Sequence, residues 1–353
     1  MKVAVTWNHE RSHVIGRFGT PAADRHSRPA AENVVGALRE RGHDALLCEA
    51  DIALPQALAR FLPPQADGRP GGIVFNMAQG IQGESRQAHV PAILEMAGVP
   101  YTGAGPLGHA LVRDKVLVKR LLRDAGVATP ACRVMRTGQE DTGPLGYPLV
   151  AKPLHGSNGF GVHLVGERAQ LAPTVQALAA RYRQDVLVEE YVDGREICVA
   201  LLGNADPDVL PFVEHDFGIR TAPIITAQDL ASPAHDEPAR LCPARVGPEL
   251  ARHLREAAVA AFQACRCRDY AFVCVRVDRA GRVVVLEVDP MASLGVNAPY
   301  ALAARTAGMS FPALVERILD AAHKRIFAVP LATSQEAEPA TEPATGEDVA
   351  LPG

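Results

Sequence analysis

The chain has 353 residues, a length that fits two or three compact domains better than a single one. Apolar residues make up 48% of the sequence and charged residues 22%, which is ordinary for a soluble globular protein. No apolar run reaches the roughly eighteen residues of a membrane span, and the N-terminal apolar stretch is too short for a signal peptide. The net charge of −4 excludes a strong basic field. We therefore expect a cytoplasmic protein with no nucleic-acid or membrane partner.

The first part of the sequence, residues 1–110, predicts an α/β domain with a parallel sheet. Apolar strand-like runs alternate with helical patterns, and glycines follow both helices. The expected strands are Val3–Thr6, Ala45–Cys48, Gly72–Asn76 and Val99–Tyr101, and the expected helices are Ala31–Arg41 and Val90–Ala97. No G-x-G-x-x-G motif follows the first strand, which argues against a dinucleotide-binding dehydrogenase.

Residues 111–193 predict a small α+β domain. After a helix over Asp114–Ala125, two strands, a second helix and a third strand follow in ββαβ order. A glycine-rich loop, His155–Gly161, joins the first two strands. The expected elements are the strands Leu149–Pro153, Val162–Val165 and Val186–Tyr191 and the helix Leu171–Arg183.

Residues 194–330 predict a third unit, which contains a strand at Glu196–Leu202 and a hairpin. The hairpin pairs Ala271–Val277 with Val283–Val288 around a turn with Gly281. A helix over Phe311–Ile326 follows. Residues 331–353 carry five acidic residues, no Lys or Arg and almost no large apolar side chains, so we expect a disordered acidic tail.

The seven cysteines are scattered, and only Cys265 and Cys267 lie close together in the sequence. An odd count without Cys-x-x-Cys spacing argues against a disulfide framework or a zinc site. We expect reduced cysteines that are partly in the core.

The glycine-rich loop and the lysine before it form a candidate anion site. Glycines allow backbone N–H groups to approach phosphate oxygens. Lys152 follows the apolar run Leu149–Ala151, where a lysine is costly unless it meets an anion. The alternatives are a simple flexible turn and a lysine whose stem reaches solvent.

Two acidic segments complete the candidate site. The strand Val186–Val192 ends in Glu189, Glu190 and Tyr191, where backbone groups can pair with a purine ring and a nearby acid can accept from a ribose hydroxyl. Glu287 and Asp289 alternate along a strand, which places both carboxylates on one face, about 7 Å apart. Such oxygen ligands suit Mg²⁺ shared with nucleotide phosphates, although an exposed acidic strand face is the alternative.

Together these segments resemble the D-alanine–D-alanine ligase branch of the ATP-grasp superfamily, from about Ile73 to Ile326. The Phe75-Asn76 start and Gln79-Gly80, where the cell-wall enzymes carry His-Gly, are more similar to a side branch of ligase-like proteins. The motifs in family order are Val74-Phe75-Asn76, Gly80–Glu84, Val90–Ala92, Leu94-Glu95, Gly98–Gly103, Asp114-Lys115, Lys152-Pro153, the glycine loop, Glu189–Val192, Gly194–Glu196 and Leu286–Pro290.

The resemblance implies an ATP-grasp fold behind a Rossmann-like N-terminal domain, with ATP and Mg²⁺ as cofactors and a reaction that joins a carboxylate to an amine through an acyl phosphate. A homodimer is common in the family. The implied catalytic residues are Ser157, Asn158 and Ser293, the nucleotide-binding residues are Lys115, Lys152, Glu189, Glu190, Tyr191, Val192 and Glu196, and the metal ligands are Glu287 and Asp289.

The sequence departs from the family at the chemical centre. Cys274 stands where an Asp metal ligand is usual, Asp289 where Asn is usual, and Phe272 where an Arg steadies the intermediate. No Lys occurs between Lys152 and Lys324 for the lid, and Arg220, Arg240 or Arg245 is the candidate substitute.

The acceptor pocket departs as well. Ala292-Ser293 replaces Pro-Gly, and Ala298 replaces a Ser that often anchors the acceptor carboxylate. We therefore expect a carboxylate–amine ligase with an acceptor other than D-alanine. A nucleotide-binding protein with little ligase activity and a true D-alanine–D-alanine ligase remain the alternatives.

Overall fold

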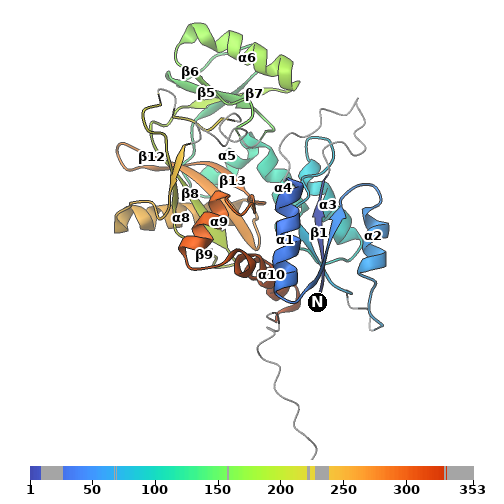
Figure 1. The fold of residues 1–353 in the computed structure, drawn as a ribbon. Helices are drawn as coiled ribbons and strands as arrows, with labels where there is room; N and C mark the ends of the chain where they lie inside the picture. The colour runs from blue at the N-terminus through green and yellow to red at the C-terminus, as the bar shows by residue number, and fades with distance from the viewer. Residues whose placement is uncertain are drawn as a thin grey trace, which may run out of the picture.

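The computed structural model describes residues 1–8, 27–66, 68, 70–156, 159–220, 223–226, 238–329 and 331. Within them, helices accompany three sheets, which occupy three separate parts of the molecule (Figure 1). Each sheet falls inside one of the three segments expected from the sequence, and we keep 1–110, 111–193 and 194–330 as proposed domain boundaries. The predicted tail, apart from Leu331, lies outside the described residues.

The first sheet is parallel, in the order β2-β1-β3. Its strands are β1 (Lys2–Trp7), β2 (Asp44–Glu49) and β3 (Ile73–Asn76), each close to its predicted position. The predicted strand over Val99–Tyr101 is wrong, because only an isolated bridge joins Tyr101 to Val74 before the chain turns. The helices of this part are α1 (Arg28–Glu40), α2 (Leu54–Phe61), α3 (Arg86–Met96) and α4 (Pro106–Arg113).

The second sheet is antiparallel, in the order β4-β7-β5-β6. The predicted ββαβ order is present, and β4 adds an edge strand that the sequence reading missed. Asp114 caps α5 by accepting hydrogen bonds from the first-turn N–H groups. The elements are α5 (Lys115–Asp124), β4 (Cys132–Met135), β5 (Leu149–Pro153), β6 (His163–Val165), α6 (Arg168–Tyr182) and β7 (Val186–Glu190).

The third sheet is built around β8 (Gly194–Leu202), which pairs with β10 (Val213–Asp216) and β12 (Tyr270–Asp278). The predicted hairpin of β12 with β13 (Val283–Asp289) is confirmed, with a register shift between Cys274 and Val275. The sequence reading missed α8 (Pro248–Ala264), α9 (Pro299–Thr306) and the short strands β9 (Asp208–Val209) and β11 (Ala239–Leu241).

The two faces of this third sheet differ in chemistry. Alternate residues of β8 and β12, such as Ile197, Val199 and Val273, are buried in a core with Leu254 and Phe262 of α8. The residues between them line a cavity on the opposite face: Glu196, Cys198, Phe272, Cys274 and Arg276.

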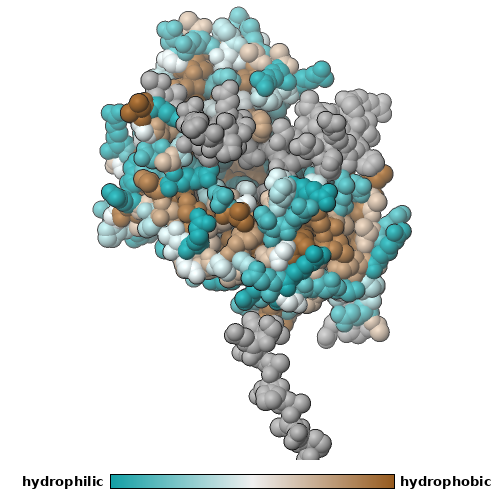
Figure 2. All heavy atoms as spheres, viewed as in Figure 1, coloured by the Kyte–Doolittle hydropathy of each residue, from teal (hydrophilic) through white to brown (hydrophobic). Residues whose placement is uncertain are grey.

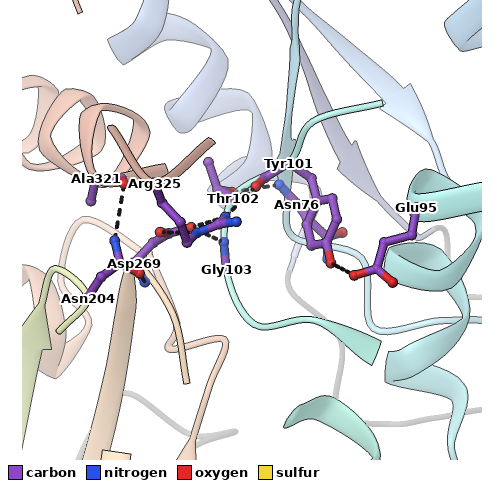
Figure 3. A network of polar contacts seen from close by, with 9 residues as sticks. All are labelled: Asn76, Glu95, Tyr101, Thr102, Gly103, Asn204, Asp269, Ala321 and Arg325. Atoms are coloured by element: carbon purple, nitrogen blue, oxygen red, sulfur yellow. Dashed lines mark hydrogen bonds and ion pairs between the residues drawn. The ribbon is translucent and has the colours of Figure 1, made fainter. Parts of the chain in front are cut away.

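The last helix, α10 (Phe311–Phe327), ties the first part to the third. Its Arg325 pairs with the fully buried Asp269 at 2.8 Å and donates to the Tyr101 carbonyl at 2.9 Å (Figure 3). Asp269 also accepts a hydrogen bond from the Gly103 N–H at 2.8 Å. The loop after Tyr101 is therefore held by residues of the third part of the chain. None of the described helices is long and apolar enough to cross a membrane.

Candidate functional site

A cavity of about 720 Å³ collects most of the predicted site residues. In Figure 2 the surface is hollowed between the upper part, which holds β5, β6 and β7, and the parts below. The predicted residues that line the cavity are Lys115, Lys152, Glu189, Glu190, Tyr191, Val192, Glu196, Glu287, Asp289 and Ser293. Ser157 and Asn158 lie outside the described residues, and their neighbours Gly156 and Gly159 line the cavity.

A buried ion-pair cluster forms one wall. Glu189 of β7 lies between Lys152 of β5, at 2.5 Å, and Lys119 of α5, at 2.8 Å. Burial alone would raise the pKa of Glu189, but the two ammonium groups outweigh it and hold the pKa at about 2. Burial likewise lowers the pKa of Lys152, and Glu189 more than offsets this, so Lys152 stays a cation. The sequence reading missed Lys119, although it follows Lys115 by one helical turn.

Lys115 gives the same wall a third amino group. Its Nζ donates to the carbonyls of Leu154, at 3.4 Å, and Gly156 in the glycine loop. Burial, followed by the nearby charge of Lys152, lowers the pKa of Lys115 to about 7. A bound polyanion would reverse that shift, because it would stabilise the charged form of this lysine.

The glycine loop is anchored at its start. The His155 N–H donates to Gln184 Oε1 at 2.6 Å, and Arg113 donates to the His155 carbonyl at 3.3 Å. The His155 ring Nδ1 also lies 3.1 Å from the Arg113 carbonyl. These contacts fix the end of the loop nearest Lys115 and Lys152.

Arg276 organises the end of the cavity that holds Tyr191 and Val192. Its guanidinium is buried, lies 2.7 Å from Glu196 Oε2 and donates to the Val192 carbonyl at 3.3 Å. The rings of Tyr191 and Phe217 each lie 5.4 Å from the guanidinium carbon. The backbone of the predicted purine-binding segment is therefore held in place by a cation from the third sheet.

The two candidate metal ligands lie on β13 across from cysteine and phenylalanine. Glu287 pairs in register with Cys274, and Asp289 with Phe272. Asp289 accepts from the Met291 N–H at 2.9 Å, and Glu287 is exposed toward the cavity. In the part of the chain that the structure describes, no group of three or more His, Cys, Asp or Glu side chains could hold a metal ion. The pair fits a cation that takes its other ligands from phosphate and water, as Mg²⁺ does.

Comparisons with known proteins agree with this arrangement. The sequence family described as D-ala D-ala ligase C-terminus matches residues 121–320. The D-alanine–D-alanine ligase of Xanthomonas axonopodis pv. citri (strain 306) is 34% identical over 310 residues, which cover 86% of this chain and 92% of that protein. The chain belongs to the D-alanine–D-alanine ligase family.

An uncharacterized protein of Sinorhizobium fredii (strain NBRC 101917 / NGR234), y4sG, is 50% identical over 337 residues, covering 93% of this chain and 98% of that protein. The crystal structure of the Bacillus anthracis D-alanine–D-alanine ligase complexed with ATP superposes with a TM-score of 0.71 at 21% identity, over 92% of this chain and 98% of that one. This likeness confirms the predicted ATP-grasp ligase fold.

The far end of the cavity of this D-alanine–D-alanine ligase family member is built around Phe272 and Tyr300. Phe272 and Tyr300 pack with ring centroids 6.1 Å apart, and the Tyr300 hydroxyl donates to the Leu201 carbonyl at 2.8 Å. Arg240 donates to the Asn297 carbonyl at 2.9 Å. Met291, Ala292, Ser293 and Ala298 also line the cavity. Phe272, Met291, Ala292 and Ala298 give this wall an apolar surface beside the polar groups of Arg240, Asn297 and Ser293.

Proposed function

We propose that the protein is an ATP-dependent carboxylate–amine ligase that forms an amide bond through an acyl phosphate. The observation that carries the proposal is the arrangement of charge around one cavity. Lys115 and Lys152 lie on one wall and Glu287 and Asp289 on another, close enough for Glu287 to influence the pKa of both lysines. Such an arrangement suits a triphosphate with a divalent cation.

In this proposal the charge of each residue decides which part of the nucleotide or cation it binds. Lys115 and Lys152 hold phosphate oxygens, and Glu287 and Asp289 hold Mg²⁺, which neutralises charge on the transferring phosphoryl group when bound. Glu190 and Val192 meet adenine through the backbone, and Glu196 accepts from the ribose while Arg276 fixes its carboxylate. Ser157 and Asn158 cover the phosphates from the loop. The catalytic contribution of the chain is positioning and electrostatic stabilisation.

The acceptor is an amine other than D-alanine. Phe272 supplies no charge for an acceptor carboxylate or an oxyanion, and Ala298 supplies no hydroxyl. An apolar wall of this kind favours a substrate that presents a hydrophobic side chain to Tyr300 and Met291. Ser293, at the same end, is the hydroxyl that we place beside the reacting groups.

The test is phosphate release from ATP and Mg²⁺ with a panel of amino acids and carboxylates, followed by mass spectrometry of condensation products. We expect release only in the presence of a substrate pair, with a product other than D-alanyl-D-alanine. The Lys152→Met variant is the matched control, because it lacks one of the two lysines that we propose hold phosphate oxygens. D-alanyl-D-alanine as the main product would instead show a true D-alanine–D-alanine ligase.

A nucleotide-binding protein with lost or weak ligase activity is the second candidate, and Cys274 and Phe272 favour it. Tight binding of ATP without phosphate release under any pair of substrates would establish it.

The seven cysteines are all free, which suits a reducing compartment, and we place the protein in the cytoplasm. Size-exclusion chromatography with light scattering tests the proposed homodimer.

A further inference from the structure

Two thiols face each other in the middle of the third sheet. Cys198 of β8 pairs in register with Cys274 of β12, and their sulfur atoms lie 2.7 Å apart. Directly opposed residues of antiparallel strands have Cα atoms about 4.5–5.5 Å apart, a separation that disulfides accept. Because an S–S bond is about 2.05 Å long, bond formation requires the sulfurs to approach by less than about 1 Å.

The pair lies in the wall of the cavity, where Cys274 is half-buried and Cys198 is buried. Cys198 and Cys274 both line the cavity that contains Glu287 and Asp289. Cys265 and Cys267, in contrast, are packed in the apolar core against α8 on the other face of the sheet. Of these four thiols, only Cys198 and Cys274 line the cavity.

An imidazole distinguishes the two thiols of the pair. His215 of β10 lines the same cavity as the two thiols. It lies on the strand that pairs with the Cys198 strand, two residues beyond the register partner of Cys198. The neighbouring Cys274 thiol and His215 both act to lower the pKa of Cys198 against the effect of burial. We therefore assign Cys198 as the attacking thiol, with the Cys274 sulfur 2.7 Å away as the second thiol.

We propose that Cys198 and Cys274 form a peroxide-reactive dithiol in the wall of the nucleotide cavity. The Cys198 thiolate attacks one oxygen of a hydroperoxide, the O–O bond breaks, and the departing oxygen takes a proton and leaves as water or alcohol. The Cys274 thiol then attacks the resulting sulfenic acid, the S–S bond forms, and the hydroxyl leaves with the thiol proton as water. The two thiols lose two electrons, and the peroxide gains them.

A bound nucleotide and its cation would cover the dithiol, an expectation that rests on the proposed function. The wall that holds the two sulfurs is the one that carries Glu287, opposite Cys274 in register. Oxidation is therefore fast in the empty cavity and slow in the occupied one.

The experiment treats the reduced full-length protein with hydrogen peroxide and maps cysteines by non-reducing peptide mass spectrometry. We expect a Cys198–Cys274 linked peptide that dithiothreitol reverses. In Cys274→Ser, the trapping reagent dimedone should label Cys198, and in Cys198→Ser the rate of peroxide consumption should fall at least tenfold. Cys48→Ser is the control that should behave as the unaltered chain. Equal oxidation rates in Cys198→Ser and the unaltered chain would overturn the proposal.

A second arm separates the dithiol from the proposed function. A non-hydrolysable ATP analogue with Mg²⁺ should slow disulfide formation at least tenfold. Disulfide formation at an unchanged rate with the analogue bound would overturn the nucleotide position and leave the dithiol standing. Normal substrate-dependent phosphate release in a protein that forms neither the disulfide nor the sulfenic acid would overturn the dithiol and leave the ligase standing.

Discussion

The two walls of the cavity differ in their charged groups. In the wall from α5, β5 and β7, Lys119, Glu189 and Lys152 compensate one another in a buried cluster. In the wall from β12 and β13, the acids Glu287 and Asp289 lie in register with Cys274 and Phe272, which carry no counter-charge. The difference indicates that the first wall is tied to the stability of the fold, whereas the second leaves its acids available to a cation.

The largest effect should come from removing the carboxylate that Lys119 and Lys152 share. Glu189→Gln leaves two buried lysines without their counter-charge, which should cost about 3–5 kcal/mol of unfolding free energy. Urea denaturation measures it. The control is Glu190→Gln. Glu190 lies 3.5 Å from Arg282, and because both side chains reach solvent, the loss of unfolding free energy should stay below about 1 kcal/mol. Similar losses in both variants would contradict the cluster's role.

Removing one lysine should separate binding from folding. In Lys152→Met, Glu189 keeps Lys119 as a partner, so the protein should stay folded. Loss of a charged contact to phosphate should weaken nucleotide affinity by about 2–3 kcal/mol, or roughly 50-fold. Isothermal titration calorimetry measures this, with Lys324→Met as the control, because the Lys324 side chain of α10 is exposed. Unchanged affinity in Lys152→Met would show that the phosphates lie elsewhere.

The pH dependence of binding should report on Lys115. In the free protein its pKa is about 7, below the usual value for lysine, and a bound triphosphate raises it. Above pH 7 the free lysine is neutral and the bound one is charged, so binding takes up a proton and affinity falls up to about tenfold per pH unit. Calorimetry in buffers of different ionisation enthalpy detects the proton. Lys115→Met should abolish the uptake, and its persistence in that variant would assign it elsewhere.

Adding an acid at Cys274 should have the smallest effect. Cys274→Asp adds an oxygen ligand opposite Glu287, and oxygen is what Mg²⁺ prefers. We expect one tight and one weak Mg²⁺ site in the unaltered chain with ATP, and a severalfold tighter second site in the variant. Mg²⁺ titration of nucleotide binding measures both. Two equally tight sites before the substitution would contradict the expected consequence of Cys274.

Local sequence patterns predicted the helices and strands whose apolar residues repeat with a clear period. The strand at Leu149–Pro153 and the β12–β13 hairpin are of this kind, and both were placed within a residue or two. The short run Val99–Tyr101 has strand-like residues, but only one bridge forms there. The helix α8 carries Leu250, Leu254 and Ala258 at four-residue intervals, so its periodicity was available in the sequence and was missed.

Pairings between distant residues could not be read from local patterns. The partner of Lys119 on α5 is Glu189 on β7, and the contact exists only because the fold brings this helix to that strand. The approach of Cys198 to Cys274 depends on the register of β8 against β12, across 76 residues of sequence. The family resemblance identified the proposed nucleotide-binding residues, and the structure was needed to identify the residues that contact them.

The junction of Arg325 with Asp269, Gly103 and Tyr101 has a consequence for how the protein matures. The loop after Tyr101 is translated early, whereas the arginine that secures it comes almost last. On the ribosome, the ion pair with Asp269 and the hydrogen bond to the Tyr101 carbonyl cannot form until α10 has been synthesised. A nascent chain that stalls before residue 325 therefore lacks both contacts, although the Gly103 N–H can already reach Asp269.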